Sequence, residues 1–315
     1  MEKTNKIVIV GAGNVGATTA YALLISGIAS ELVLYDINRQ KAEGEIMDLA
    51  HGASFVPPTR LRAGYLADCR EADIIIFTAG AAQQPGETRL DLVDKNTRIV
   101  EKALLPILEQ APEALVLMVT NPVDVLTYQA WKLSGLSPER VLGSGTVLDS
   151  ARFRHVLGQH CGVDVRNVHG YILGEHGDSE LAAWSSVHIG GIRLDDYCLA
   201  CGQGCGQEKR EEMFRQVRDA AYQIIQAKGA TYYAVGLAVR RICEAILRDE
   251  HSILTVSSLM QGEYGLRDVC LSVPCVIGRQ GRIKVLELNL TAEEKEKLQH
   301  SAAVIASYLP ATDRK

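Results

Sequence analysis

The sequence predicts an α/β protein in which a doubly wound parallel sheet is followed by an α+β domain with mostly antiparallel strands. The first observation is a set of apolar, β-rich runs in the first half: "KIVIV", "ELVLYD", "DIIIFTAG", "ALVLMVTNP" and "RVLGSG". The second is that stretches with helical spacing separate these runs, which is typical of a parallel sheet covered on both faces. With 315 residues the chain is long enough for two domains, which we expect at 1–143 and 144–315.

The second half has a different pattern. A long helical segment is expected from about Glu208 to Glu250, with a bend near Gly229. Thr291 and Glu294 have the spacing of a capping box, which predicts the start of a final helix. Short runs around the long segment predict the antiparallel strands: "VRNVHGYILG", "SSVHIGGIRL", "SILTVSSLMQG", "DVCLSVPCVIG" and "RIKVLELNL".

Charge and hydropathy exclude two classes of partner. The net charge of -5 and the lack of long basic runs give no reason to expect nucleic acid. The uncharged stretch from Ile7 to Ser30 is interrupted by glycines and Asn14, unlike a membrane span or a signal peptide. We therefore expect a cytoplasmic protein without a membrane segment.

The eight cysteines are expected to be reduced thiols. Five stand singly among apolar neighbours, as small core residues do: Cys69, Cys161, Cys243, Cys270 and Cys275. The other three, Cys198, Cys201 and Cys205, lie in "CLACGQGC", which we interpret as a variable surface turn. A metal site is the less favoured alternative because no fourth ligand is near in the sequence.

The stretch "GAGNVG" is predicted to bind a dinucleotide. It follows a strand and opens a helix, so that Gly11 allows the tight turn, Gly13 the approach of the pyrophosphate and Gly16 close packing. Asp36 ends the next strand, 20 residues after Gly16. Its carboxylate suits the ribose hydroxyls and repels a 2′-phosphate, which favours NAD over NADP. The alternative, a plain turn, does not require this order of a strand, a helix and an acid.

Four further segments carry side chains suited to hydride transfer. His176 in "GEHGD" has the chemistry of a proton donor, and Asp149 could fix its tautomer. Arg152 follows Asp149 by three residues, so the two share a helix face, and its guanidinium suits a substrate carboxylate. Arg89 could polarise a carbonyl, and Asn121 ends the fifth strand. Each residue taken alone could also be structural.

Together these residues resemble the L-lactate/malate dehydrogenase family, most closely its bacterial L-lactate-specific members. The resemblance covers nearly the whole chain, through "IVIVGAGNVG", "DLVDKN", "TNPVD", "GEHGDSE", "LDSARFR", "GATYYAVG" and "YGLRDVCLSVP". It implies reversible hydride transfer between NADH and pyruvate, giving (S)-lactate and NAD in fermentation. A non-catalytic NADH sensor is the alternative from another class, and it would have no reason to keep these side chains together.

The resemblance also assigns roles to residues. His176 would exchange the proton and pair with Asp149, Arg152 would bind the substrate carboxylate, and Arg89 would polarise the carbonyl. Asn121 would contact both the nicotinamide and the substrate, and Thr231 would line the pocket. The cofactor site implied by the resemblance comprises Gly11, Gly13, Asn14, Val15, Gly16, Asp36, Thr78, Ala79, Gly80 and Asn121.

Gln83 separates lactate from malate as the expected product. Malate dehydrogenases typically carry arginine at the matching position, where it pairs with the second carboxylate of oxaloacetate. A glutamine leaves that carboxylate unpaired, and neighbouring Gln84 would do the same if the register were shifted. Lactate and pyruvate are therefore expected, with malate or a bulkier 2-hydroxy acid as the alternative.

Arg154 and His169 match the pair that binds fructose 1,6-bisphosphate at a subunit interface of the bacterial relatives. The resemblance implies activation by this ligand and a homotetramer, although both residues could be ordinary interface residues. About five residues precede the first predicted strand, so we expect no N-terminal arm to clamp the subunits.

Overall fold

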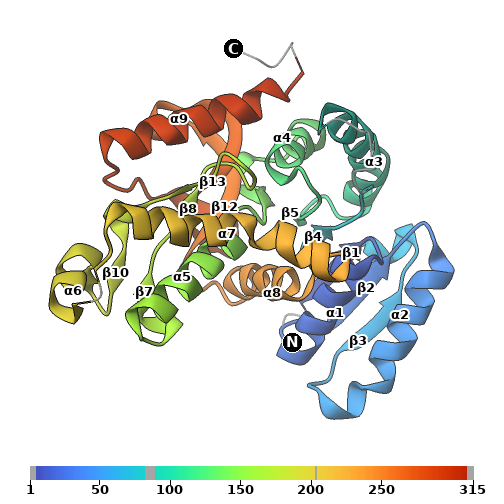
Figure 1. Ribbon diagram of the computed structural model, residues 1–315. Helices are drawn as coiled ribbons and strands as arrows, with labels where there is room; N and C mark the ends of the chain where they lie inside the picture. Colours follow the sequence, from blue (N-terminus) through green and yellow to red (C-terminus); the bar gives the residue numbers. More distant parts are fainter. Residues whose placement is uncertain (1–4, 82–88, 203, 311–315) are drawn as a thin grey trace.

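The computed structural model describes residues 5–81, 89–202 and 204–310, and the side chains of Arg89 and Cys201 lie outside that description (Figure 1). Six parallel strands form the first half, in the order β3-β2-β1-β4-β5-β6. These strands are β1 (Lys6–Val10), β2 (Glu31–Tyr35), β3 (Arg60–Ala63), β4 (Ile74–Phe77), β5 (Leu115–Met118) and β6 (Val141–Gly143). The helices between them are α1 (Asn14–Ser26), α2 (Arg39–His51), α3 (Arg89–Gln110) and α4 (Val123–Ser134).

The first strand explains why the parallel strands are apolar throughout. Ile7 and Ile9 belong to a buried cluster with residues of α1 and of α8 (Tyr233–Leu247), whereas Val8 and Val10 belong to a second cluster with residues of α3. Both faces of the strand are therefore covered, as a doubly wound sheet requires. The predicted fold class is confirmed.

The second half adds antiparallel strands and five helices within the described residues. The strands are β7 (Val168–His169), β8 (Ile172–Leu173), β9 (Leu181–Ala182), β10 (His188–Ile189), β11 (Ile192–Arg193), β12 (Ser252–Gln261), β13 (Arg267–Gly278) and β14 (Gly281–Val285). The helices are α5 (Val147–Cys161), α6 (Leu194–Cys201), α7 (Gln207–Lys228), α8 (Tyr233–Leu247) and α9 (Ala292–Ser307). Short 3-10 turns are η1 (Ala53–Phe55), η2 (Leu66–Cys69), η3 (Pro138–Arg140), η4 (Val165–Asn167), η5 (Trp184–Ser186) and η6 (Glu263–Gly265).

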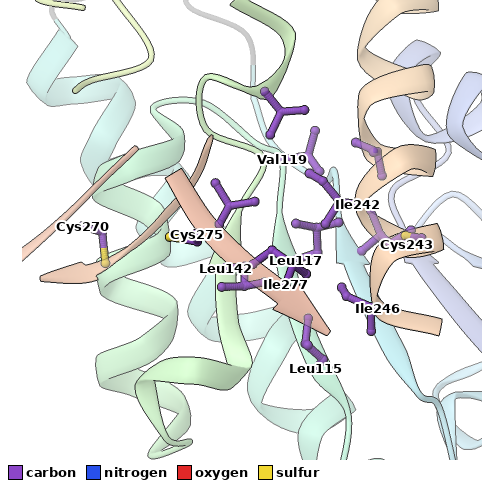
Figure 2. Close-up of a cluster of buried hydrophobic side chains, with 14 of the residues drawn as sticks. Leu115, Leu117, Val119, Leu142, Ile242, Cys243, Ile246, Cys270, Cys275 and Ile277 are labelled. Atoms are coloured by element: carbon purple, nitrogen blue, oxygen red, sulfur yellow. The ribbon is translucent and has the colours of Figure 1, made fainter. Parts of the chain in front are cut away.

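The central sheet continues from the first half into the second. Strand β12 pairs antiparallel with β6, with Ser257 opposite Gly143, and the order extends to β14-β13-β12-β6. Figure 2 shows the result on one face, where Leu115 and Leu117 of β5, Leu142 of β6 and Ile242 of α8 lie in one buried cluster. The two halves therefore share a hydrophobic core.

Two details differ from the sequence-based expectation. The predicted bent helix is two helices, α7 and α8, because Gly229 ends the first one in a left-handed conformation with a φ of +85°. Strand β3 was not predicted, because Arg60 and Arg62 give it the polar character of an edge strand.

The capping box of α9 is confirmed, with Glu294 N–H donating to Thr291 Oγ1 at 3.2 Å.

The expectation of a surface turn at "CLACGQGC" is wrong for two of its cysteines. Cys198 and Cys205 are 9% and 7% exposed, and both pack in a cluster with Phe153, Leu157 and residues of α7. The left-handed Gly202 and Gly204 turn the chain back between them, so small thiols face the interior. The five single cysteines are buried, as expected.

No helix in the described part of the chain has the length and the apolar character needed to cross a membrane.

Gly16→Ala is expected to destabilise the fold strongly, since its Cβ would lie 1.9 Å from the Gly11 carbonyl oxygen, which is backbone and cannot move freely. Overpacking of this kind costs about 1–3 kcal/mol or more. Gly44→Ala is the matched control: it lies within α2 with open space around it, and we expect a gain of up to about 1 kcal/mol. Urea unfolding of both variants checks this, and equal midpoints would contradict it.

Candidate active site

In the glycine loop between β1 and α1, Gly11 and Gly16 are tightly packed and Gly13 faces open space. Gly11 has a φ of +107°, and its N–H donates to the Tyr35 carbonyl at 2.8 Å. A Cβ on Gly11 or Gly16 would collide with neighbouring atoms, whereas a Cβ on Gly13 would meet nothing within 4 Å. The opening at Gly13, beside the first N–H groups of α1 at Asn14 and Val15, fits a bound pyrophosphate.

Asp36 fastens the end of β2 to the glycine loop. Its Oδ2 accepts from Ala12 N–H at 2.6 Å, and its Oδ1 accepts from Asn38 N–H at 2.7 Å. The sequence predicted a ribose ligand, and the structure adds a backbone-holding role. Each carboxylate oxygen has a second lone pair, so these bonds leave acceptor capacity for a ribose hydroxyl.

The segment after β4 lines the same edge of the sheet. The Thr78 hydroxyl donates to the carbonyls of Val10 at 2.9 Å and Gly11 at 3.1 Å, so it holds the loop from behind. Ala79 lies against Gly11, and a Cβ on Gly80 would lie 2.3 Å from Thr120 Cγ2. This close packing fixes the backbone of Thr78, Ala79 and Gly80 against the glycine loop.

Asn96, which the sequence analysis did not single out, joins this segment to Asn121. It is fully buried in α3, its Oδ1 accepts from Ala81 N–H at 2.8 Å, and its Nδ2 donates to the Asn121 carbonyl at 2.8 Å. The Asn121–Pro122 peptide bond is cis, and the exposed Asn121 stands just before α4. The signal for Asn96 was its place in "DLVDKN", a string that was read only as part of a resemblance.

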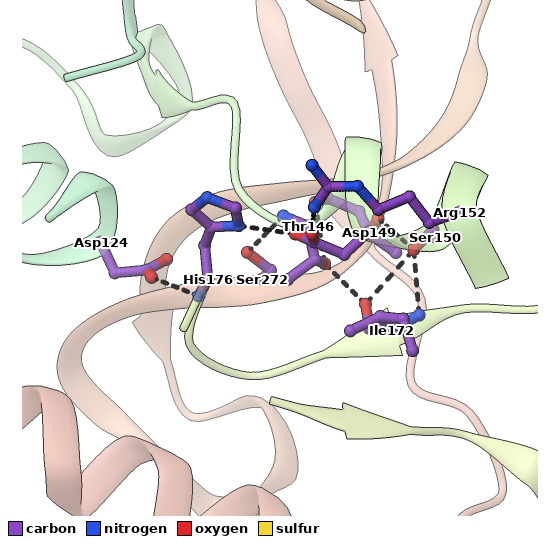
Figure 3. Close-up of polar contacts among 9 residues, drawn as sticks. Asp124, Thr146, Asp149, Ser150, Arg152, Ile172, His176 and Ser272 are labelled. Carbon is purple, nitrogen blue, oxygen red and sulfur yellow. Dashed lines mark hydrogen bonds and ion pairs between the residues drawn. The ribbon is translucent and has the colours of Figure 1, made fainter. Parts of the chain in front are cut away.

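His176, Asp149 and Arg152 form one connected group, with the carboxylate in the middle (Figure 3). His176 Nδ1 lies 2.6 Å from Asp149 Oδ2, and Arg152 donates from Nη1 to Asp149 Oδ1 at 2.7 Å. The Asp149 side chain is 4% exposed, against 14% for Arg152 and 26% for His176. The predicted His–Asp pair is therefore present in the geometry, and one N–H of Arg152 is used within the group.

The charges in this group determine its protonation. Burial alone would lower the pKa of His176, but the Asp149 carboxylate outweighs it, with help from Asp124 and Glu180, and raises that pKa to about 9. Burial alone would raise the pKa of Asp149, but His176 and Arg152 hold it below its usual range. At neutral pH the group therefore holds a protonated His176 imidazole beside an ionised Asp149 carboxylate. The imidazole can donate a proton from Nε2.

Asp124 anchors the backbone of His176, and the sequence analysis passed over it within "VTNPVD". Its Oδ2 accepts from the His176 N–H at 2.7 Å, and the side chain is 2% exposed. Burial raises the pKa of Asp124 to about 6, so its carboxyl is ionised at pH 7. This carboxylate is a second negative charge next to the histidine.

The turn that carries His176 is also braced by α9. Ser301 Oγ accepts from the Glu175 N–H at 2.7 Å, and Glu175 Oε2 accepts from the Ser179 hydroxyl at 2.6 Å. Gly174 has a φ of +90°, and a Cβ there would lie 2.5 Å from Ser301 Oγ. The imidazole is thus held by its side chain and by its backbone.

The remaining predicted residues are placed as follows. Gln83 lies outside the described residues, and Arg89 begins α3 with a side chain outside that description. Thr231 is half-buried between α7 and α8. Arg154 lies on α5, where its Nε donates to the Ser150 carbonyl at 3.2 Å and burial lowers its pKa, and His169 is exposed on β7. Within the described residues no group of three or more His, Cys, Asp or Glu side chains is arranged to hold a metal ion.

Comparisons with known proteins cover almost the whole chain. An L-lactate dehydrogenase of Thermoanaerobacter sp. (strain X514) is 58% identical over 98% of this chain and 99% of its own length. One from Moorella thermoacetica is 55% identical over 95% of both chains. The crystal structure of a minor L-lactate dehydrogenase from Enterococcus mundtii, in a ligand-bound form, is 40% identical and superposes with a TM-score of 0.94 over 97% of both chains.

The two family matches separate the residues of the glycine loop from the group around His176, as the geometry does. Residues 5–143 match the lactate/malate dehydrogenase NAD binding domain, which contains the glycine loop and Asp36. Residues 146–310 match the alpha/beta C-terminal domain of that family, which contains Asp149, Arg152 and His176. NAD is therefore the cofactor, and the chain belongs to the lactate/malate dehydrogenase family of oxidoreductases.

Proposed function

We propose that this enzyme is an L-lactate dehydrogenase, which reduces pyruvate to (S)-lactate in fermentation and can run in reverse. The single observation that carries the proposal is the Asp149 carboxylate bound to both His176 and Arg152. A 2-oxo acid needs a proton donor at its carbonyl and a cation at its carboxylate, and this group presents both side by side.

Each residue has a defined task in this reaction. NADH, when bound, supplies the hydride to the carbonyl carbon. His176 gives its Nε2 proton to the carbonyl oxygen, while Asp149 keeps the imidazole oriented and stabilises its charge. Arg152 pairs with the substrate carboxylate through N–H groups not used by Asp149, and Arg89 polarises the carbonyl. Asn121 and Thr231 border the nicotinamide and the substrate.

We infer that the cofactor lies across the glycine loop. Gly11, Gly13 and Gly16 with Asn14 and Val15 would surround the pyrophosphate at the start of α1, and Asp36 would accept from the adenosine ribose. Thr78, Ala79 and Gly80 would form the floor on the side of the nicotinamide. The open space at Gly13 supports this assignment.

We infer that lactate, rather than malate, is the natural product. Gln83 supplies no charge for a second carboxylate, and burying an unpaired carboxylate costs several kcal/mol. The curated relatives at 55–58% identity are L-lactate dehydrogenases, which supports the same assignment.

We further propose a homotetramer in the cytoplasm, with fructose 1,6-bisphosphate as its activator bound by Arg154 and His169. Burial lowers the pKa of Arg154, so an anion that approaches it would replace lost hydration with charge pairing. Arg154 follows Arg152 by two residues on α5, so binding at one is coupled to the position of the other. We propose domains at 1–143 and 144–315, a division supported by the ends of the two family matches.

His176→Ala is expected to reduce the turnover of pyruvate by about 10²–10⁴-fold, since general acid catalysis contributes that much. In the unchanged enzyme, pyruvate reduction is expected to fall as the pH rises through about 9, because the proton of His176 is lost there. Stopped-flow NADH oxidation across pH checks both statements. His51→Ala, at an exposed position that ends α2, is the control. Near-normal turnover of His176→Ala would refute the role of the imidazole.

Gln83→Arg is expected to raise the preference for oxaloacetate over pyruvate by about a thousandfold, by pairing the second carboxylate. Steady-state kcat/KM for both substrates checks it. Gln84→Arg is the matched control, and a larger shift in that variant would reassign the specificity position to Gln84. No shift in either variant would count against the assignment of this loop to the substrate.

Asp124→Asn is expected to move the pH profile of pyruvate reduction to lower pH. The amide oxygen still accepts from the His176 N–H, but the negative charge that helps to raise the pKa of His176 is gone. The pH dependence of kcat/KM measures the shift. Asp48→Asn, at an exposed position of α2, should leave the profile in place. If the pH profile of Asp124→Asn does not move, the charge of Asp124 does not raise the pKa of His176. Asp124 would then act only through its hydrogen bond from the His176 N–H.

A further inference from the structure

An arginine stands close to the proposed ribose site. Arg39 is the first residue of α2, and Asp36 directly follows β2. Asp36 Oδ1 accepts from the Asn38 N–H at 2.7 Å, so the chain turns here and α2 starts beside the Asp36 carboxylate. In dinucleotide-binding sheets an acid at this place favours NAD, whereas a nearby arginine accommodates the 2′-phosphate of NADP. Two side chains that favour opposite cofactors are therefore neighbours in this chain.

Two contacts hold the guanidinium of Arg39. Its Nε lies 2.8 Å from Oε1 of Glu43, one turn further along α2. Its Cζ lies 3.5 Å from the centroid of the Tyr65 ring, so the guanidinium covers an aromatic face. Its Nη1 is buried and makes no hydrogen bond to any described residue. The charge of Arg39 is thus balanced by Glu43, while one of its nitrogens has no acceptor.

The place of Tyr65 follows from the order of the strands. Strand β3 pairs parallel with β2, and beyond its end the Gly64 N–H donates to the Leu34 carbonyl at 2.9 Å. Tyr65 comes next, so it follows the carboxyl end of β3 as Asp36 follows the carboxyl end of β2. The Tyr65 N–H donates to Asp68 Oδ2 at 2.8 Å, which fixes its backbone at the start of η2. The ring therefore stands at the same edge of the sheet as the proposed ribose site.

We propose that Glu43 is a specificity-determining residue, which holds Arg39 on the Tyr65 ring and so withholds the guanidinium from a 2′-phosphate. This inference rests on the proposed placement of the adenosine ribose at Asp36. NADP then meets two obstacles, because Asp36 repels its 2′-phosphate and the cation beside Asp36 is already paired. NAD carries no 2′-phosphate, so its binding does not depend on whether Arg39 is free. Two carboxylates, rather than one, select the cofactor.

The exposure of the ion pair sets the size of the effect. The side chains of Arg39 and Glu43 are 35% and 49% exposed, so water screens their attraction and the pair is weak. A guanidinium bound to a phosphate makes charge-assisted bonds that can be bidentate, and the unused Nη1 is available as a donor. Loss of Glu43 should leave the start of α2 intact, since the Asn38 side chain accepts from the Lys41 N–H at 3.2 Å. We therefore expect a change of several-fold, not of a thousandfold.

The test is fluorescence titration of the full-length protein with NADH and with NADPH, which measures binding without turnover. Asp36→Asn is the starting variant, because its amide oxygen still accepts from the Ala12 N–H but carries no charge. In that background Glu43→Gln is expected to lower the Kd of NADPH relative to that of NADH by about fivefold. Adding Arg39→Gln is expected to abolish this gain, as a double-mutant cycle between residues 39 and 43 would show.

Glu45→Gln is the matched control, since it removes one negative charge from the same helix without removing the partner of Arg39. It should change the ratio of the two Kd values less than Glu43→Gln does. A gain that requires both the loss of Glu43 and the presence of Arg39 supports the inference.

The outcomes separate this inference from the placement of the ribose. If Asp36→Asn leaves the ratio of the two Kd values unchanged, the ribose does not lie at Asp36 and both ideas are overturned. If Asp36→Asn changes the ratio but Glu43→Gln adds nothing, the placement stands and the inference is wrong. If the gain of Glu43→Gln persists with Arg39→Gln, Glu43 acts by repulsion alone, and the role given to Arg39 is refuted.

Discussion

The site depends on one buried carboxylate that makes two charged contacts. Asp149 binds the imidazole of His176 with one oxygen and the guanidinium of Arg152 with the other. Without these two cations the buried carboxylate would take up a proton. Without the carboxylate the two cations would repel each other with no compensating charge. The proton donor and the anion-binding group are therefore stabilised by the same side chain, and neither position can be altered independently of the other.

The position of Asp149 depends in turn on the start of α5. Thr146 donates from its N–H to the Ser272 hydroxyl at 3.1 Å and from its Oγ1 to the Ile172 carbonyl at 2.6 Å (Figure 3). The Ser150 hydroxyl accepts from the Ile172 N–H at 2.9 Å. These bonds join α5 to β8 and β13, and all of these polar groups are buried. The first turn of the helix is thereby fixed relative to the strand that leads to His176.

Much of this arrangement could be predicted from the sequence, because periodicity and motif spacing record local geometry. The parallel strands, the glycine loop and the proximity of Asp149 and Arg152 follow from patterns within a few residues. Asp124 and Ser301 could not be found that way, since their partners are 52 and 126 residues distant in the chain. The burial of Cys198 and Cys205 was missed because the pattern of a glycine-rich turn does not reveal which of its side chains face the core.

The pairing of β12 with β6 has a consequence for the chain as a folding unit. If the first half were cut away after Gly143, β6 would become an edge strand with unpaired backbone groups. Leu115, Leu117 and Leu142 would lose the cover of α8 and present an apolar surface to water. The nucleotide-binding half is therefore not a portable module in this protein: separated from its neighbour, it would be prone to aggregate, and transplanting it into another enzyme would require a substitute for α8 and β12.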